Sequence, residues 1–67
     1  MIIIFNDIPI KLPQEIVTIG DLVKWKQISS QGTAIAVNDK LIIQDQWETK
    51  TIKDQDRITV ISAAFGG

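Results

Sequence analysis

The residues of this chain that could carry out chemistry lie at its C-terminal end. The sequence of 67 residues contains no cysteine and no histidine, so it lacks a thiolate nucleophile, a disulfide, and the side chains that most often bind transition metals or act as general bases. It ends in Gly66 and Gly67. An ending without side chains can enter a narrow channel in a partner, and it leaves the Gly67 carboxylate accessible for attack on the α-phosphate of ATP.

A flexible terminus explains the same two glycines more simply. Glycine makes up about 7% of average sequences, and the last residues of a domain are often poorly ordered. The ending alone therefore favours a flexible tail. A reactive Gly67 needs support from the rest of the chain.

A second group of residues with chemical potential is acidic. Four carboxylates lie near one another in the sequence, at Asp45, Glu48, Asp54 and Asp56. Their spacing does not match an EF-hand loop or another dense set of cation ligands. We therefore expect a solvated surface here rather than a metal site.

The overall composition argues against several classes of function. The formal net charge is −1, whereas binding to nucleic acid or to an anionic membrane needs clustered lysine and arginine. Residues 1–5 are apolar but too few for a membrane span or a secretory signal. We expect a cytoplasmic protein, although the isoleucine-rich composition also suits the stroma of a plastid. The 45% apolar content predicts a globular domain with Trp25 and Trp47 as packing residues.

The N-terminal residues predict a β-hairpin. Residues 1–5 are apolar and mostly β-branched, which indicates a strand covered on both faces in the centre of a sheet. Asn6 and Asp7 tolerate the positive φ of a tight turn. Residues 8–12 then alternate as a second strand, which we place at an edge because Pro9 has no N–H to donate.

The middle of the chain predicts one helix, and the remainder predicts three more strands. Thr18 followed by Asp21 is a capping pattern for a helix that begins near Ile19. Residues 44–55 are polar apart from Trp47 and Ile52 and indicate a surface connection, with a helical turn anchored by Trp47. The remaining strands are predicted at residues 33–37, 41–43 and 57–61.

This order of elements predicts an α+β fold. The apolar strands at the two ends of the chain can pair in parallel at the centre of a mixed sheet of four to five strands, with the helix on one face. That is the ubiquitin-like β-grasp arrangement. Residues 1–62 would form the domain, and residues 63–67 a flexible Gly-Gly tail that reaches about 17 Å when extended. A β-grasp body makes a reactive Gly67 the better interpretation of the ending.

Several separated segments resemble the ThiS family of sulfur carriers, and the likeness extends over the whole chain. The similar segments are residues 4–7 (IFND), 36–38 (AVN), 46–47 (QW), 52–56 (IKDQD) and the final Gly66 and Gly67. The family commonly has Val-Pro-Arg where this chain has residues 42–44 (IIQ), so Gln44 stands at the position of the family's arginine. It also has Asp-Gly-Asp where this chain has Gln55 between two aspartates, and Gln55 must then adopt a backbone angle that favours glycine, at a cost of about 1 kcal/mol.

The resemblance implies a function and a site. In this family an E1-like adenylating enzyme, ThiF, uses ATP and Mg²⁺ to convert the terminal carboxylate, here that of Gly67, into an acyl-adenylate. Sulfur from a donor such as a cysteine desulfurase then replaces AMP, and thiazole synthase, ThiG, consumes the resulting thiocarboxylate. The chain would thus be a carrier rather than an enzyme and would bind no cofactor itself. Its partner-binding tail would comprise Ala64, Phe65 and Gly66, with Phe65 as an anchor.

Three other functions remain open at this point. A MoaD-type carrier for molybdopterin has the same fold, adenylation and Gly-Gly ending, but such proteins are typically longer. A ubiquitin-like modifier would be attached through Gly67 to lysine amines and would yield an isopeptide. A β-grasp interaction domain would bind partners through its sheet or an edge strand and would not need Gly67.

Overall fold

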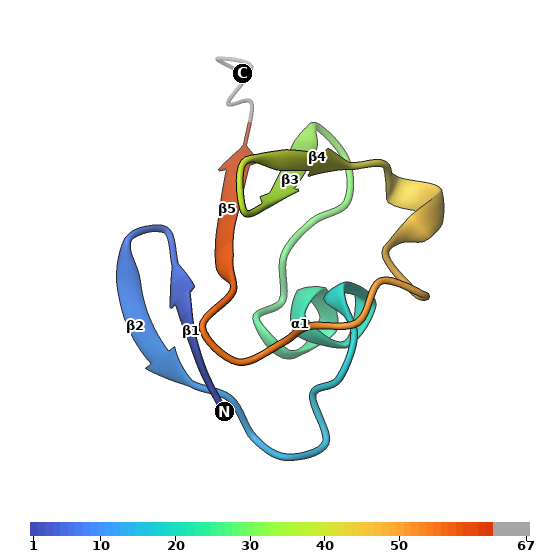
Figure 1. Ribbon diagram of the computed structural model, residues 1–67. Coiled ribbons are helices and arrows are strands. Elements are labelled where there is room, and N and C mark those ends of the chain that lie inside the picture. The colour runs from blue at the N-terminus through green and yellow to red at the C-terminus, as the bar shows by residue number, and fades with distance from the viewer. Residues whose placement is uncertain (63–67) are drawn as a thin grey trace.

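Residues 1–62, which the computed structural model describes, form a mixed sheet with a helix against it (Figure 1). The elements are β1 (Ile2–Phe5), β2 (Ile8–Lys11), α1 (Ile19–Trp25), β3 (Thr33–Val37), β4 (Lys40–Ile42), the 3₁₀ turn η1 (Gln44–Gln46) and β5 (Arg57–Ser62). Each predicted strand and the predicted helix are present. No helix in this described part of the chain is long and apolar enough to cross a membrane.

The sheet has five strands within the described residues, in the order β2-β1-β5-β3-β4. β1 and β5 run parallel, as predicted for the two ends of the chain, and the other neighbours are antiparallel. Pro9 lies in the edge strand β2, where a missing N–H costs no ladder hydrogen bond on the outer side. The α+β, ubiquitin-like β-grasp prediction is therefore confirmed.

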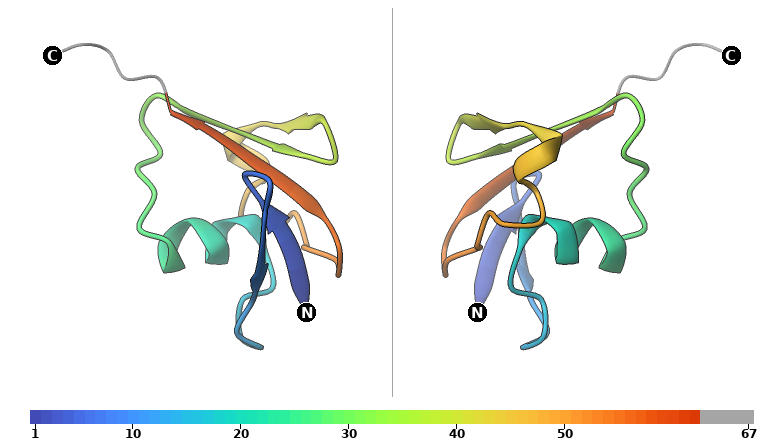
Figure 2. Two further views of the ribbon diagram at one scale, coloured as in Figure 1. Left: turned by 90° about the vertical axis from the view of Figure 1, so that its left-hand side faces the viewer. Right: turned by 90° about the vertical axis from the view of Figure 1, so that its right-hand side faces the viewer.

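One face of this sheet carries the helix, and the opposite face is open (Figure 2). The prediction that residues 1–5 form a central strand covered on both faces is therefore wrong. Ile3 of β1 is fully buried, but Ile2 is 43% exposed on the opposite face. The central strand is β5, which has β1 on one side and β3 on the other. The apolar residues 1–5 could not show whether their strand is the central strand of the sheet or the strand next to it.

The core lies between the sheet and α1. The helix begins at Ile19, as predicted, because Thr18 and Asp21 form a capping box. The Asp21 N–H donates to Thr18 Oγ1 (3.1 Å), and the Thr18 N–H donates to Asp21 Oδ2 (3.1 Å). These side chains hold the first turn in place while Ile19 and Leu22 enter the core. The buried apolar residues are Ile3, Leu12, Ile16, Ile19, Leu22, Ile35, Val37, Ile42, Trp47, Ile52 and Ile58.

The tight turns adopt left-handed backbone angles. Asn6 and Asp7 have φ of 47° and 68°, and Asn38 and Asp39 have φ of 51° and 68°. Both pairs connect antiparallel strands, and at Asn6 and Asp7 this is the hairpin geometry that the sequence predicted. Gln55 has φ of 70°, so it does adopt the angle that favours glycine.

The two tryptophans differ in their surroundings. Trp47 is only 5% exposed, and its Nε1–H donates to the Ile42 carbonyl (3.0 Å), so it anchors residues 44–55 to the body as predicted. Trp25 ends the helix and is 41% exposed. The prediction that Trp25 is a packing residue is wrong, and its ring instead lies 5.4 Å from the Lys26 Nζ in a cation–π contact.

Candidate functional site

The residues predicted to form the site lie outside the described part of the chain. These are Ala64, Phe65, Gly66 and Gly67, which belong to residues 63–67. Their roles, and the division into a domain and a tail, stay predictions. The structure does describe the strand from which they continue, because β5 ends at Ser62.

On one side β5 is held along most of its length by β3. The antiparallel register runs from Val37 opposite Ile58 to Thr33 opposite Ser62. β3 is in turn paired with β4, so three strands meet at this end of the sheet. The last residue of β5 is therefore part of the sheet and not of a loop.

On its other side β5 is held by β1 and by one side chain. The parallel register with β1 ends with Phe5 opposite Ile58, and the Asn6 N–H donates to the Ile58 carbonyl (2.9 Å). At the next step the Val60 N–H donates to Asn6 Oδ1 (2.8 Å). The Asn6 side chain thus accepts the hydrogen bond that a continuing β1 would have accepted through its backbone.

A buried carboxylate secures the start of β5. Asp56 is 7% exposed, and it accepts hydrogen bonds from Asn38 Nδ2 (2.9 Å) and from the Lys53 N–H (2.8 Å). Asn38 Oδ1 accepts in turn from the Arg57 N–H (2.9 Å). The expectation that Asp56 belongs to a solvated surface is wrong, because its partners are supplied by a distant hairpin and by its own turn.

The other three acidic residues are exposed, as expected. Asp45, Glu48 and Asp54 all lie on the surface, and residues 1–62 contain no group of three or more His, Cys, Asp or Glu able to hold a metal ion. Asp54 Oδ1 accepts a hydrogen bond from the Ile2 N–H (2.8 Å), and chiefly this bond lowers the pKa of its carboxyl below the usual value of 3.8.

The open face of the sheet carries an apolar patch that the sequence interpretation missed. Ile58 points into the core, so Ile61, three residues later, points to the other face, and it is 60% exposed. Strand register then places Ala34, Ala36 and Leu41 on the same face, with Leu41 64% exposed. We call these four residues the outer-face patch. Alternation within residues 57–62 was the signal that could have revealed it.

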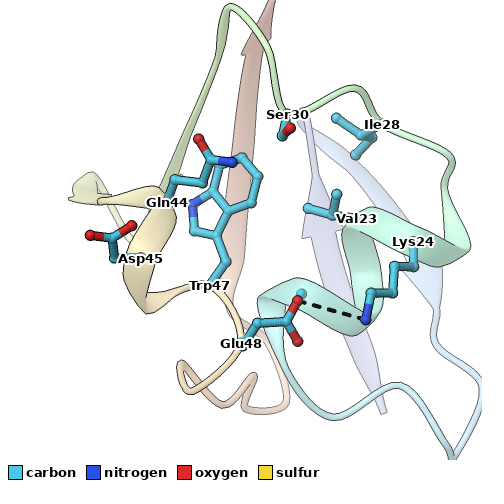
Figure 3. Close-up of a pocket in the computed structure, with 9 residues that line it drawn as sticks. Val23, Lys24, Ile28, Ser30, Gln44, Asp45, Trp47 and Glu48 are labelled. Carbon is cyan, nitrogen blue, oxygen red and sulfur yellow. Dashed lines mark ion pairs between the residues drawn. The ribbon is translucent and has the colours of Figure 1, made fainter.

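A cavity of about 450 Å³ opens between α1 and the segment that follows β4 (Figure 3). Val23 and Lys24 line it from the helix, and Gln44 and Trp47 line it from the opposite side. Lys24 Nζ lies 3.7 Å from Glu48 Oε1, in an exposed ion pair. Among the described residues, the lining of this cavity contains no group that could hold a metal ion.

The geometry defines a ubiquitin-like β-grasp domain whose central strand ends beside an exposed apolar patch. A model of the ThiS family matches residues 3–67, and the chain belongs to this family. A solved structure described as the thiamine biosynthesis protein (ThiS) from Geobacter metallireducens is similar, with a TM-score of 0.84 at 16% identity over 100% of both chains. At that identity the likeness shows the fold. A comparison with curated proteins gave no match.

Proposed function

We propose that this chain is a sulfur carrier for the synthesis of the thiazole of thiamin. The observation that carries the proposal is the ThiS family match over residues 3–67, which includes the final Gly66 and Gly67. The β-grasp fold and its likeness to a thiamine biosynthesis protein support it. The chain acts as a co-substrate of partner enzymes rather than as an enzyme.

The reactive group is the α-carboxylate of Gly67. A carboxylate is a poor acyl donor until one of its oxygens becomes part of a good leaving group. A ThiF-like enzyme provides AMP as that leaving group. The carboxylate oxygen attacks the α-phosphate of ATP, which releases pyrophosphate and leaves an acyl-adenylate. The terminal sulfur of a persulfide on a donor protein such as a cysteine desulfurase then displaces AMP to form an acyl disulfide. A thiol reductant cleaves its S–S bond and leaves the thiocarboxylate on Gly67. ATP and Mg²⁺ belong to the activating enzyme, and no cofactor is assigned to this chain.

The folded body presents this carboxylate to its partners. Ser62 is held in the sheet opposite Thr33, so the tail starts from a defined position on the domain. The five residues that follow can span at most about 17 Å. The outer-face patch lies on the strands that meet at this point, and its exposed Ile61 and Leu41 offer a hydrophobic surface to the activating enzyme and to a ThiG-like thiazole synthase. Alanine, phenylalanine and glycine at positions 64–66 complete the partner-binding tail.

Intact-mass measurement tests the proposal directly. Incubation with a ThiF-like enzyme, ATP and a sulfur donor is expected to raise the mass by one oxygen-to-sulfur exchange, and the increase is expected to vanish without ATP. Gly67→Val is the matched variant: it should fold normally but resist adenylation, because a β-branched side chain crowds the carboxylate. An unchanged mass for the natural sequence would contradict the proposal, and an isopeptide conjugate would indicate a protein modifier.

The choice of pathway needs a second measurement. A MoaD-type carrier would give the same change in mass, because adenylation and thiocarboxylate formation are common to both. The thiocarboxylate form is therefore offered separately to thiazole synthase and to the large subunit of molybdopterin synthase. Sulfur transfer to thiazole synthase is expected, and transfer only to molybdopterin synthase would overturn the assignment to thiamin.

A further inference from the structure

The central strand β5 continues beyond the hairpin that flanks it. Its register with β1 stops at Phe5 opposite Ile58, whereas its register with β3 continues to Thr33 opposite Ser62. Figures 1 and 2 show the end of β5 extending past the β1–β2 turn. The last part of the strand is thus paired on one side only within the described residues.

The direction of the backbone groups follows from the hydrogen bonds at the start of β5. The Arg57 carbonyl accepts from the Asn38 N–H (2.7 Å), so Arg57 faces β3, and the Ile58 carbonyl accepts from the Asn6 N–H (2.9 Å), so Ile58 faces β1. Successive residues of a strand alternate in direction. The carbonyl of Val60 and the N–H and carbonyl of Ser62 therefore face the side on which β1 has already ended.

We propose that an extended segment of the adenylating enzyme pairs with this edge of β5 at Val60 and Ser62, as an added strand. The inference rests on the proposed function, which supplies the partner. Asn6 sets the register, because its side chain already accepts the Val60 N–H (2.8 Å) and leaves the Val60 carbonyl as the first group available to the added strand. Backbone pairing of this kind gives affinity through main-chain hydrogen bonds.

The position of this edge in the chain supports the adenylating enzyme as its occupant. Residues 63–67 follow Ser62 directly, and they can span at most about 17 Å. A strand of the enzyme seated on Val60 and Ser62 therefore lies within that distance of the carboxylate it must activate. The exposed Ile61 lies between these two residues in the chain and points to the open face, so the same segment can also contact the outer-face patch.

The two outer edges of the sheet are poorer sites for an added strand. β2 contains Pro9, which cannot donate, and Lys11. β4 has only three residues and begins with Lys40. Proline, lysine and short length are features by which proteins protect edge strands from unwanted pairing. Neither residues 57–62 of β5 nor the neighbouring Asn6 turn carries a proline.

Replacing one backbone N–H tests the proposal. In a chemically synthesised chain the Ser62 amide becomes an ester, which removes the donor on the open side. The β3 pairing of Thr59 is unchanged, and the Ile61 carbonyl still faces Ala34 of β3 but becomes a weaker acceptor. Ser62→Ala, which keeps the N–H, is the control. We expect the ester to raise the KM for adenylation about threefold to tenfold relative to Ser62→Ala, with kcat unchanged and the urea midpoint slightly lowered because the Ile61 carbonyl is a weaker acceptor. An unchanged KM would overturn strand addition.

Hydrogen exchange gives a second readout that does not depend on chemical synthesis. The Ser62 amide is expected to exchange rapidly in the free protein and to become protected when the adenylating enzyme is added without ATP. The Thr59 amide, which faces β3, is expected to be protected in both states. Unchanged exchange at Ser62 in the complex would refute the pairing. If the natural sequence is not adenylated at all, the proposed function fails, and with it the assignment of this enzyme as the occupant.

Discussion

The side-chain amide of Asn38 donates a hydrogen bond to the buried carboxylate of Asp56 over a distance of 2.9 Å. Asn38 begins the turn between β3 and β4, and Asp56 precedes β5, so the bond joins a hairpin to the central strand. Each side-chain oxygen in this pair has a donor: Asn38 Oδ1 accepts from Arg57, and Asp56 Oδ2 accepts from Lys53. The arrangement is directional, which makes it testable by exchanging the two residues.

Exchange of the two side chains should restore what either single change removes. Asn38→Asp would set two carboxylates against each other, and Asp56→Asn would set two amide donors against each other, so each should lower the free energy of unfolding by about 1–3 kcal/mol. In the double variant every oxygen and donor again has a partner, so its own loss should be small and the coupling energy should approach the sum of the two single losses, about 2–6 kcal/mol. Urea unfolding of all four proteins measures it. Additive losses would show that the pair is not the directional contact described here.

Asn6 should stabilise β5 through its side chain and not only through its turn. Asn6→Gly keeps the left-handed angle accessible but removes the oxygen that accepts from Val60, whereas Asn6→Asp keeps an acceptor. The glycine variant is expected to be about 1 kcal/mol less stable than the aspartate variant. Chemical denaturation compares them, and hydrogen exchange at Val60 should accelerate in the glycine variant alone. Equal stabilities would limit the role of Asn6 to the turn.

The left-handed angle at Gln55 predicts a stabilising substitution. Its φ of 70° strains a side chain with a Cβ, and glycine removes that strain. Gln55→Gly should be more stable than Gln55→Ala by about 1 kcal/mol, because both lose the weak contact of Gln55 with Asp54 (3.4 Å) and only alanine keeps the Cβ. Thermal and urea unfolding check the difference. A more stable alanine variant would contradict a strained turn.

Asp54 should make part of the stability depend on pH. Its pKa is lowered in the folded state, mainly by the hydrogen bond from the Ile2 N–H, so the ionised form stabilises the fold. This contribution is fully present above the unfolded pKa of about 3.9 and is lost as pH falls through the lower, folded pKa. The stability gap between the natural sequence and Asp54→Asn should therefore be largest near neutral pH and shrink in acid. A stability difference that does not depend on pH would show that the charge of Asp54 does not stabilise the fold.

The outer-face patch should matter to the partner and not to the fold. Ile61→Lys places a charge in the patch at a side chain that is 60% exposed, and Val17→Lys is the control at another exposed apolar residue, 47% exposed. Both should change stability by less than about 0.5 kcal/mol. Ile61→Lys should raise the KM for adenylation by about tenfold or more, and Val17→Lys should not. ATP-pyrophosphate exchange kinetics measure this, and equal KM values would exclude the patch as a contact.

Local patterns in the sequence predicted the elements well because their causes are local. The capping pair Thr18 and Asp21 lies within one turn of the helix it starts, and Asn6 and Asp7 supply the angles of their own hairpin. The parallel pairing of the chain ends also followed from the pattern, because two apolar strands needed burial. The site residues at positions 64–67 rest on the sequence and on the family match, since the described structure ends at Ser62.

Two of the features that were missed depend on contacts between distant residues. The residues next to Asp56 in the sequence do not indicate its hydrogen bond with Asn38, which lies 18 positions away. The bond from Val60 to Asn6 spans 54 positions, and no local pattern indicates it. Trp25 is three residues from the buried Leu22 and so shares its helical face, yet it is exposed at the end of the helix.

The central place of β5 also affects how the protein is made. β1 and β3 are not neighbours in the sheet, and among the described strands only β5, which follows β1 to β4 in the chain, joins them. A nascent chain that has not yet exposed residues 57–62 can form the two hairpins but cannot bury Ile3 against Ile35 through Ile58. Premature termination before β5 should therefore yield polypeptides that proteases remove, so that domains lacking the tail-bearing strand do not accumulate and compete for the activating enzyme.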